Sequence, residues 1–214
     1  MLVVGLTGGI ASGKSTAGRI FREAGIPVIC ADELAHEAVM PGSVALEKIR
    51  QRFGEEFIDS EGNLNREAMA SLVFRDKDKR RELESIIHPW VAEEQEKMLR
   101  EFAIQGHKIA VVDVPLLYEA GLEKSFDTVV VAYVPPEVQI QRLTARDRIN
   151  ESEARARLDA QLPIEKKKQL AAAVINNAGS LEQTKEQVLL LIEKLQAVAE
   201  SGSGRAGGTV ERNQ

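Results

Sequence analysis

The chain has 214 residues, which suffices for one or two domains with a sizeable core and excludes a small module. Its 28 Lys and Arg residues against 33 Asp and Glu give a net charge of −5, so no global positive field exists to hold nucleic acid or an anionic membrane. The single cysteine fits a reducing compartment, and every apolar run is shorter than the ~18 residues of a membrane span. We therefore expect a soluble, cytoplasmic protein.

Four continuously apolar runs predict buried parallel strands, because none shows the alternation of a half-solvated strand. They are Leu2–Leu6, Pro27–Cys30, Ile109–Val112 and Thr128–Val134. Amphipathic stretches between or after them predict helices at Ser15–Ala24, from Glu119 onward, at Pro136–Arg148 and at Leu181–Ala199. This alternation indicates an α/β fold with helices on both faces of a parallel sheet.

Three segments depart from this pattern. Residues 32–106 are rich in charge and helix-like, and predict an inserted helical subdomain. Residues 142–168 carry alternating charge with a thin apolar stripe, which is typical of a mobile lid. The tail, residues 201–214, begins with linker composition and is expected to be disordered. We thus expect one domain over residues 1–200, whose core comprises residues 1–31, 107–141 and 169–200.

The segment Gly8–Ser15 has the P-loop spacing GxxxxGK[ST], and it follows an apolar strand and precedes a helix. Gly8 and Gly13 let the backbone turn so that its N–H groups, with the helix N-terminus, cradle a phosphate chain. Lys14 is expected to reach the β- and γ-phosphates, and the hydroxyl of Ser15 to ligate Mg²⁺. A Gly-rich turn with an accidental Lys-Ser pair is the alternative.

Two carboxylates follow apolar strands. Asp113 ends the run Ile109–Val112 as in a Walker B strand, which predicts a role at Mg²⁺, direct or through a bound water. An ordinary turn or cap residue is the alternative for Asp113. Asp32 follows the run Pro27–Cys30 at the same edge of the sheet, so it is a candidate base for the phosphoryl acceptor. For Asp32 the alternative is a helix N-cap.

Basic residues supply further candidates. Arg142 and Arg146 lie four residues apart in a predicted helix, so both project from one face and suit the migrating γ-phosphoryl group. The alternative is a solvated face that pairs with Asp147, Glu151 and Glu153. Pro89 restricts His88 and predicts that the helix Arg80–Ile87 ends there. The run Lys166–Lys168 indicates a solvated helix face.

Motifs in order from Leu6 to about Leu195 resemble those of the dephospho-CoA kinases. They include LTGGIASGKST at 6–16, Ala31-Asp32, Leu64-Asn65-Arg66, Ile87-His88-Pro89, Pro115-Leu116-Leu117-Tyr118-Glu119, Gln141-Arg142-Leu143 with Arg146, and Asn177-Ala178-Gly179. The resemblance implies transfer of the ATP γ-phosphoryl group to the ribose 3′-hydroxyl of dephospho-CoA, giving CoA and ADP, with Mg²⁺ as cofactor. It also implies a three-layer α/β/α P-loop fold with a helical substrate-binding insert and a helical lid.

The resemblance also implies roles for single residues. Asp32 matches the residue that accepts the proton of the attacking hydroxyl, and Arg142 matches a lid arginine near the transferred phosphate. Arg66 and His88 fall in the subdomain that holds dephospho-CoA. Asn177 is expected near the adenine. The ATP-binding set is then Gly9, Ala11, Ser12, Gly13, Lys14, Ser15, Thr16, Arg146 and Asn177.

Ala11 and Cys30 depart from the family pattern. Ala11 stands where many members have Gly, so the cradle requires a φ compatible with Ala. Cys30 stands where an Asp is frequent, which leaves Asp32 as the single carboxylate of that motif.

Two other functions stay open. A nucleoside or nucleotide kinase would share the phosphate-binding residues but take a shorter acceptor. A GTP-dependent switch would carry an Asn-Lys-x-Asp signature, which the sequence lacks. The expected partners are ATP and dephospho-CoA, and we expect binding to neither nucleic acid nor a membrane. The protein is expected to be a monomer, and a homo-oligomer stays open.

Overall fold

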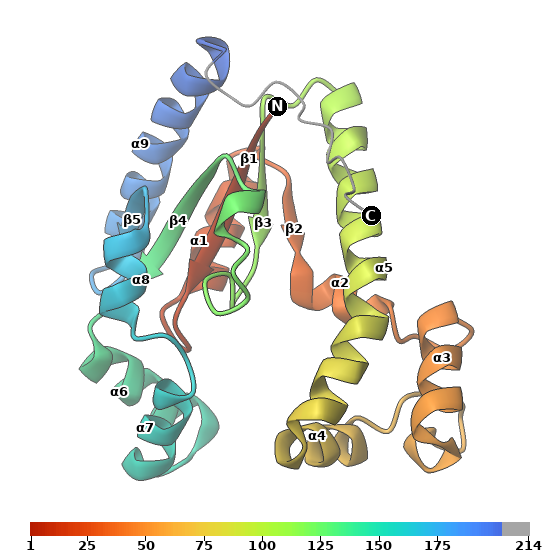
Figure 1. Ribbon diagram of the computed structural model, residues 1–214. Helices are drawn as coiled ribbons and strands as arrows, with labels where there is room; N and C mark the ends of the chain where they lie inside the picture. Colours follow the sequence, from red (N-terminus) through yellow and green to blue (C-terminus); the bar gives the residue numbers. More distant parts are fainter. Residues whose placement is uncertain (203–214) are drawn as a thin grey trace. The chain divides into compact units, whose positions relative to one another are not determined.

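Figure 1 shows the computed structural model, which describes residues 1–202 of the 214-residue chain. The chain divides into two compact units. The first comprises Met1–Ile29 and the chain from Phe102 onward, and the second comprises Cys30–Glu101. From residue 203 on, the tail that we expect to be disordered lies outside the described residues.

Within residues 1–202, five strands form one parallel sheet in the order β2-β3-β1-β4-β5 (Figure 1). They are β1 (Leu2–Gly8), β2 (Val28–Cys30), β3 (Ile109–Asp113), β4 (Thr128–Tyr133) and β5 (Ala173–Asn176). Strand β1 is central, pairing Leu6 with Asp113 of β3 and Gly8 with Ala132 of β4. The α/β class and the four expected strands are confirmed, whereas β5 was not predicted from its short apolar segment.

Helices α1 (Lys14–Glu23) and α9 (Leu181–Glu200) pack together on one face of the sheet. Their apolar stripes place Phe21 and Val188 in one buried cluster with Leu6 and Val130 of the strands. On the opposite face, Ile164 packs against the next residue of β4, Val131, because successive strand side chains point to opposite faces. The helices expected at the P-loop and near the chain end are therefore confirmed.

The connection from β3 to β4 corrects one prediction. Residues 114–127, all described, contain no α-helix, so the helix expected from Glu119 onward is wrong; they form turns and a short 3-10 helix, η2 (Glu123–Ser125). Gly121 has a φ of 67°, which interrupts a helix at this point. Leu117 is fully buried, and a Cβ at Gly5 of β1 would lie 2.7 Å from it. Close packing against β1 thus takes the place of a helix.

The segment after β4 forms α6 (Pro136–Asp147), α7 (Glu151–Asp159) and α8 (Ile164–Leu170). Helix α6 confirms the expected helix, and it ends at Asp147, with Arg148 as its C-cap at a φ of 55°. Helix α7 begins with a capping box formed by Asn150 and Glu153. The proposed lid, residues 142–168, therefore spans three separate helices.

Helix α8 is anchored to β4. The hydroxyl of Tyr133 donates to Glu165, and the ammonium of Lys168 lies 4.2 Å from the centre of the Tyr133 ring. Ile164 and Lys167 are buried beneath the helix. The interpretation of Lys166–Lys168 as a solvated face is therefore wrong at Lys167, whose side chain is 0% exposed.

The second unit is helical. It contains α2 (Ala31–Glu37), α3 (Val44–Phe53), the 3-10 helix η1 (Glu55–Phe57), α4 (Arg66–Arg75) and most of α5 (Lys77–Ile104). Its own apolar core is formed by the buried residues Ala38, Val39, Ile49 and Met69, with Trp90 packed against them. Across residues 1–202, no helix is both long and apolar enough to cross a membrane.

Helix α5 runs through Pro89, so the helix end predicted at Ile87 is wrong. A proline inside a helix costs about 3 kcal/mol, because it lacks an N–H and clashes with the carbonyl one turn earlier. Residues on both sides of Pro89, including Ile86 and Trp90, pack against the core of the second unit. This packing holds α5 together across the proline.

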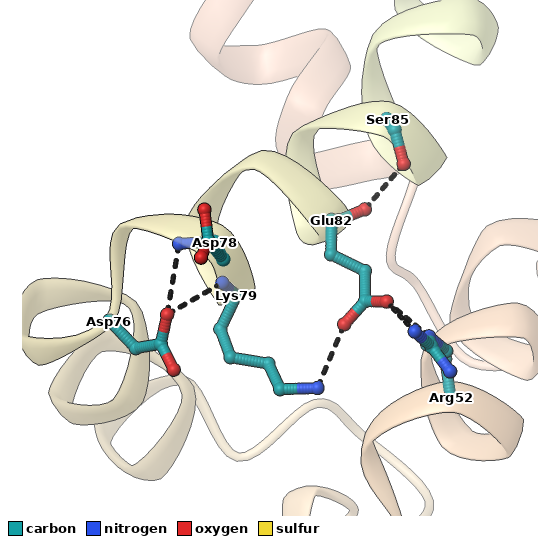
Figure 2. Close-up of polar contacts among 6 residues, drawn as sticks. All are labelled: Arg52, Asp76, Asp78, Lys79, Glu82 and Ser85. Carbon is teal, nitrogen blue, oxygen red and sulfur yellow. Dashed lines mark hydrogen bonds and ion pairs between the residues drawn. The ribbon is translucent and has the colours of Figure 1, made fainter.

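A polar network ties α3 to α5 within the second unit (Figure 2). Glu82 accepts from Arg52 of α3 and, at 2.9 Å, from Lys79. The hydrogen bond from Lys79, with the Arg52 contact, holds the pKa of Glu82 below its usual value. Asp76 caps the start of α5 by accepting from the backbone N–H of Asp78 at 2.9 Å and from that of Lys79 at 3.0 Å.

Candidate active site

The P-loop joins β1 to α1 and is closed by a turn in which the Ser12 N–H donates to the Gly9 carbonyl at 3.1 Å. Gly13 caps α1 with a φ of 83°. A Cβ at Gly13 would overlap the amide nitrogen of Asn177, so both the backbone conformation and the space require glycine. The loop therefore presents the N-terminus of α1, where N–H groups bind anions.

Ala11 adopts a left-handed conformation, with a φ of 59°. Among the described residues, only Ala11 and Arg148 combine a side chain with a positive φ. For a residue with a Cβ, the left-handed region is less favourable by roughly 1 to 2 kcal/mol, so the backbone of the loop is strained at Ala11. Ile10 and Ala11 pack against an apolar cluster that contains Leu143 of α6 and Ala154 of α7, which supports the strained tip.

Two glutamines hold both backbone polar groups of Ile10 at the P-loop tip. The side-chain amide of Gln139 on α6 donates to the Ile10 carbonyl at 2.7 Å. The Ile10 N–H in turn donates to the side-chain oxygen of Gln161, which lies just after α7, at 2.9 Å. Neither glutamine is predicted as a site residue from the sequence. Gln139 lies four residues before the buried Leu143, and a glutamine on a buried stripe is a signal of a polar partner.

Lys14 and Asp113 form an ion pair at the carboxyl edge of the sheet. Their side chains are only 17% and 9% exposed, so this charge pair is largely shielded from water. The pairing of Asp113 with Leu6 places the carboxylate beside the end of β1, from which the P-loop begins. The structure thus brings together the lysine and the acidic residue that the sequence singles out.

Oxygen donors for a magnesium ion are present among these residues. The hydroxyl of Ser15, in the first turn of α1, is part of an exposed residue, and Asp113 offers a carboxylate. Mg²⁺ prefers such hard oxygen ligands and usually takes one or two protein groups, with phosphates and waters completing its shell. The donor set therefore fits this ion.

Arg142 lies beside the P-loop. Its guanidinium donates to the backbone carbonyl of Asn177 at 2.8 Å, and a Cβ at Gly13 would lie 3.6 Å from it. Arg146 instead pairs with the neighbouring Asp147 and is exposed. Hydrogen bonds from Arg146 and also from Arg157 hold the pKa of Asp147 below its usual value. The two arginines thus have different partners.

Asn177 is buried where β5 ends and binds three segments at once. Its side-chain nitrogen donates to the Ser12 carbonyl at 3.0 Å, and its side-chain oxygen accepts from Thr184 at 2.8 Å. Its backbone N–H donates to the Tyr133 carbonyl at 2.8 Å. Asn177 therefore holds the P-loop backbone. The expected contact with the adenine stays a prediction.

The candidate acceptor residues lie in the second unit. Asp32 is exposed in the first turn of α2, two residues after β2 ends, and the N-cap of this helix is Cys30, so the alternative interpretation of Asp32 as an N-cap is wrong. Arg66 is the exposed first residue of α4, and His88 is exposed within α5. All three side chains are open to solvent within their unit.

Comparison with known proteins identifies the family. Residues 2–183 match the sequence profile described as Dephospho-CoA kinase. A dephospho-CoA kinase of Bacillus licheniformis is 44% identical over 192 residues, covering 90% of this chain and 96% of that protein. Among solved structures, TT1252 from Thermus thermophilus is 32% identical with a TM-score of 0.78, covering 91% of this chain and 97% of that one. A dephospho-CoA kinase from Campylobacter jejuni is 28% identical with a TM-score of 0.69, covering 94% and 98%. This chain therefore belongs to the dephospho-CoA kinase family.

Proposed function

We propose that this protein transfers the γ-phosphoryl group of ATP to the ribose 3′-hydroxyl of dephospho-CoA, giving CoA and ADP. The observation that carries the proposal is the Lys14–Asp113 pair beside an ordered P-loop, in a chain of this family. Phosphoryl transfer depends mainly on positioning the reactants and neutralising charge, and a P-loop with a lysine and a carboxylate can do both.

The donor half of the reaction falls to the first unit. Backbone N–H groups of the P-loop hold the phosphate chain, except those of Ile10 and Ser12, which already donate to Gln161 and Gly9. The Lys14 ammonium moves from Asp113 to the β- and γ-phosphates. Ser15 and Asp113 would hold Mg²⁺, which would supply positive charge to the phosphate chain. Arg142 is close enough to the P-loop to meet the migrating group, whereas Arg146 must first leave Asp147.

The acceptor half falls to the second unit. The 3′-hydroxyl oxygen forms a bond to the γ-phosphorus, the bond from that phosphorus to the β–γ bridging oxygen breaks, and ADP leaves. Asp32 takes the proton of the hydroxyl, a role supported by its exposed position just after β2. Arg66 and His88 hold dephospho-CoA.

This proposal also assigns a function to each segment of the chain. Residues 32–106 bind the acceptor, and residues 142–168 act as a lid over the core formed by 1–31, 107–141 and 169–200. The single cysteine supports a cytoplasmic location, and the net charge of −5 supports an enzyme that binds neither nucleic acid nor anionic membranes. We also infer a monomer.

The decisive experiment measures ADP release by the purified protein with Mg-ATP and one acceptor at a time. Dephospho-CoA is compared with AMP, CMP, dTMP, adenosine and no acceptor, and the product is identified by its mass. We expect turnover only with dephospho-CoA, yielding CoA. Turnover with a nucleotide acceptor would refute the assigned acceptor, and hydrolysis without any acceptor would instead favour a switch.

A further inference from the structure

Lys167 is a fully buried lysine whose ammonium is surrounded by oxygen acceptors. It contacts the Gly8 carbonyl at 3.3 Å, the Pro115 carbonyl at 3.1 Å and the Glu119 carboxylate at 2.8 Å. A lysine ammonium has three N–H donors, so each can take one acceptor. Burying such a charge is costly unless it is paired, which points to a specific task for this side chain.

The two carbonyls belong to the two strand ends that build the phosphate site. Gly8 is the last residue of β1, from which the P-loop leaves, and Pro115 follows Asp113 by two residues. The Thr7 hydroxyl also donates to the Pro115 carbonyl, at 3.0 Å. Lys167 and Thr7 therefore cross-link the carboxyl ends of β1 and β3.

Glu119 keeps Lys167 in place. Its carboxylate accepts from the ammonium and, at 2.9 Å, from the backbone N–H of Leu162, in the connection between α7 and α8. Glu119 is 22% exposed, so it links the buried ammonium to the protein surface. The segment that leads into α8 is thereby fixed to the loop after β3.

We propose that Lys167 is a positioning residue of the phosphate site. Its ammonium fixes the Gly8 and Pro115 carbonyls, so that the P-loop and Asp113 keep the spacing at which the Lys14 ammonium can move from Asp113 to a phosphate chain. It also holds the Gly8 carbonyl oxygen, whose partial negative charge would repel a phosphate. This inference rests on the proposed function for the role of the phosphate site.

A matched pair of variants tests the proposal. Lys167→Met keeps the length and apolar stem of the side chain and removes the ammonium, and Lys166→Met makes the same change at the exposed neighbouring position. Each protein is measured for Mg-ADP binding by calorimetry, for kcat and the KM of ATP, and for thermal unfolding. A misplaced phosphate site costs about 10- to 100-fold, so we expect Lys167→Met to weaken Mg-ADP binding and to lower kcat/KM for ATP by that factor. Lys166→Met should match the wild type.

A purely structural role would give a different result. If Lys167→Met lowers the unfolding temperature but leaves Mg-ADP affinity and kcat within about twofold of the wild type, the positioning role is refuted. Should Lys167→Met fail to fold, Glu119→Ala decides, because it removes the oxygen that holds the Lys167 ammonium. Unchanged Mg-ADP affinity in Glu119→Ala would then refute the proposal.

The nucleotide-binding readout separates this proposal from the proposed function. Mg-ADP binding needs no acceptor, so a wild-type protein that binds Mg-ADP but does not phosphorylate dephospho-CoA would refute the function alone. The difference between Lys167→Met and Lys166→Met in Mg-ADP affinity would still decide the role of Lys167.

Discussion

Replacing Gln139 by Met removes one of the two hydrogen bonds at the P-loop tip while it keeps the length of the side chain. Gln139 is 3% exposed and donates to the Ile10 carbonyl at 2.7 Å. Losing a hydrogen bond and leaving its acceptor unpaired costs about 1 to 3 kcal/mol, and Ile10 is only partly buried, so water can replace part of the bond. We therefore expect a loss of about 1 to 2 kcal/mol of stability.

This loss should be visible in two assays. In a domain of this size about 1 kcal/mol lowers the unfolding temperature by roughly 2 to 4 °C, so circular dichroism should show a fall of about 2 to 8 °C. If ATP binding must restore the conformation of the P-loop, the same free energy is subtracted from the binding free energy of ATP. The KM of ATP should then rise by about 5- to 30-fold. The control is Gln141→Met, at an exposed position of the same helix.

A Gln139→Met variant that unfolds at the temperature of Gln141→Met, with a KM for ATP within about twofold of that control, would refute this role of Gln139. A fall in unfolding temperature with an unchanged KM would show that the bond stabilises the fold without shaping the nucleotide site. Gln161→Met tests the second bond, to the Ile10 N–H. Because both glutamines bind the same residue, the loss of stability in the double variant should differ from the sum of the losses in the two single variants.

Three further predictions concern the chemistry and the anchored helix. Asp32→Asn should lower kcat by about 10²- to 10⁴-fold in steady-state kinetics with little change in ATP affinity, and near-wild-type turnover would remove Asp32 from the proton transfer. Lys14→Met should lower kcat/KM by at least about 10²-fold, and an unaltered value would overturn the P-loop assignment. The hydrogen bond to Glu165 raises the pKa of Tyr133 from 10.0 to about 12. The stabilisation of the fold by this hydrogen bond is therefore fully present below pH 10 and is lost as the pH rises through about 12. Glu165→Gln should bring this pKa back toward 10.0 in an ultraviolet titration, and an unmoved titration would show that another group raises it.

The features predicted from sequence are those that contiguous residues determine. The P-loop is recognisable because Gly8–Ser15 carries its spacing and its glycines within one short segment. The strands β1, β3 and β4 are recognisable because burial on both faces leaves a continuous apolar run.

The features that were missed depend on partners far away in the chain. Lys167 looks like one of three solvated lysines until the carbonyl of Gly8, 159 residues earlier, is placed beside it. Gln161 lies 151 residues from the P-loop tip that it binds. Pro89 predicts a helix end by local rules, and the packing of α5 on its unit outweighs that preference. Local patterns contain none of these contacts.

Three residues whose roles the sequence does not predict share one task with Asn177, which explains why the P-loop can hold a strained conformation at Ala11. Gln139 and Gln161 bind Ile10, Asn177 binds the Ser12 carbonyl and Lys167 binds the Gly8 carbonyl. All four side chains come from residues 139–177 of the first unit, and each contacts the P-loop backbone itself. A loop held in this way needs little reorganisation when a phosphate chain binds, which is the condition under which backbone N–H groups stabilise charge most strongly. Substitution of Gln139, Gln161 or Lys167 should therefore alter nucleotide affinity, although none of these side chains is assigned a contact with the nucleotide.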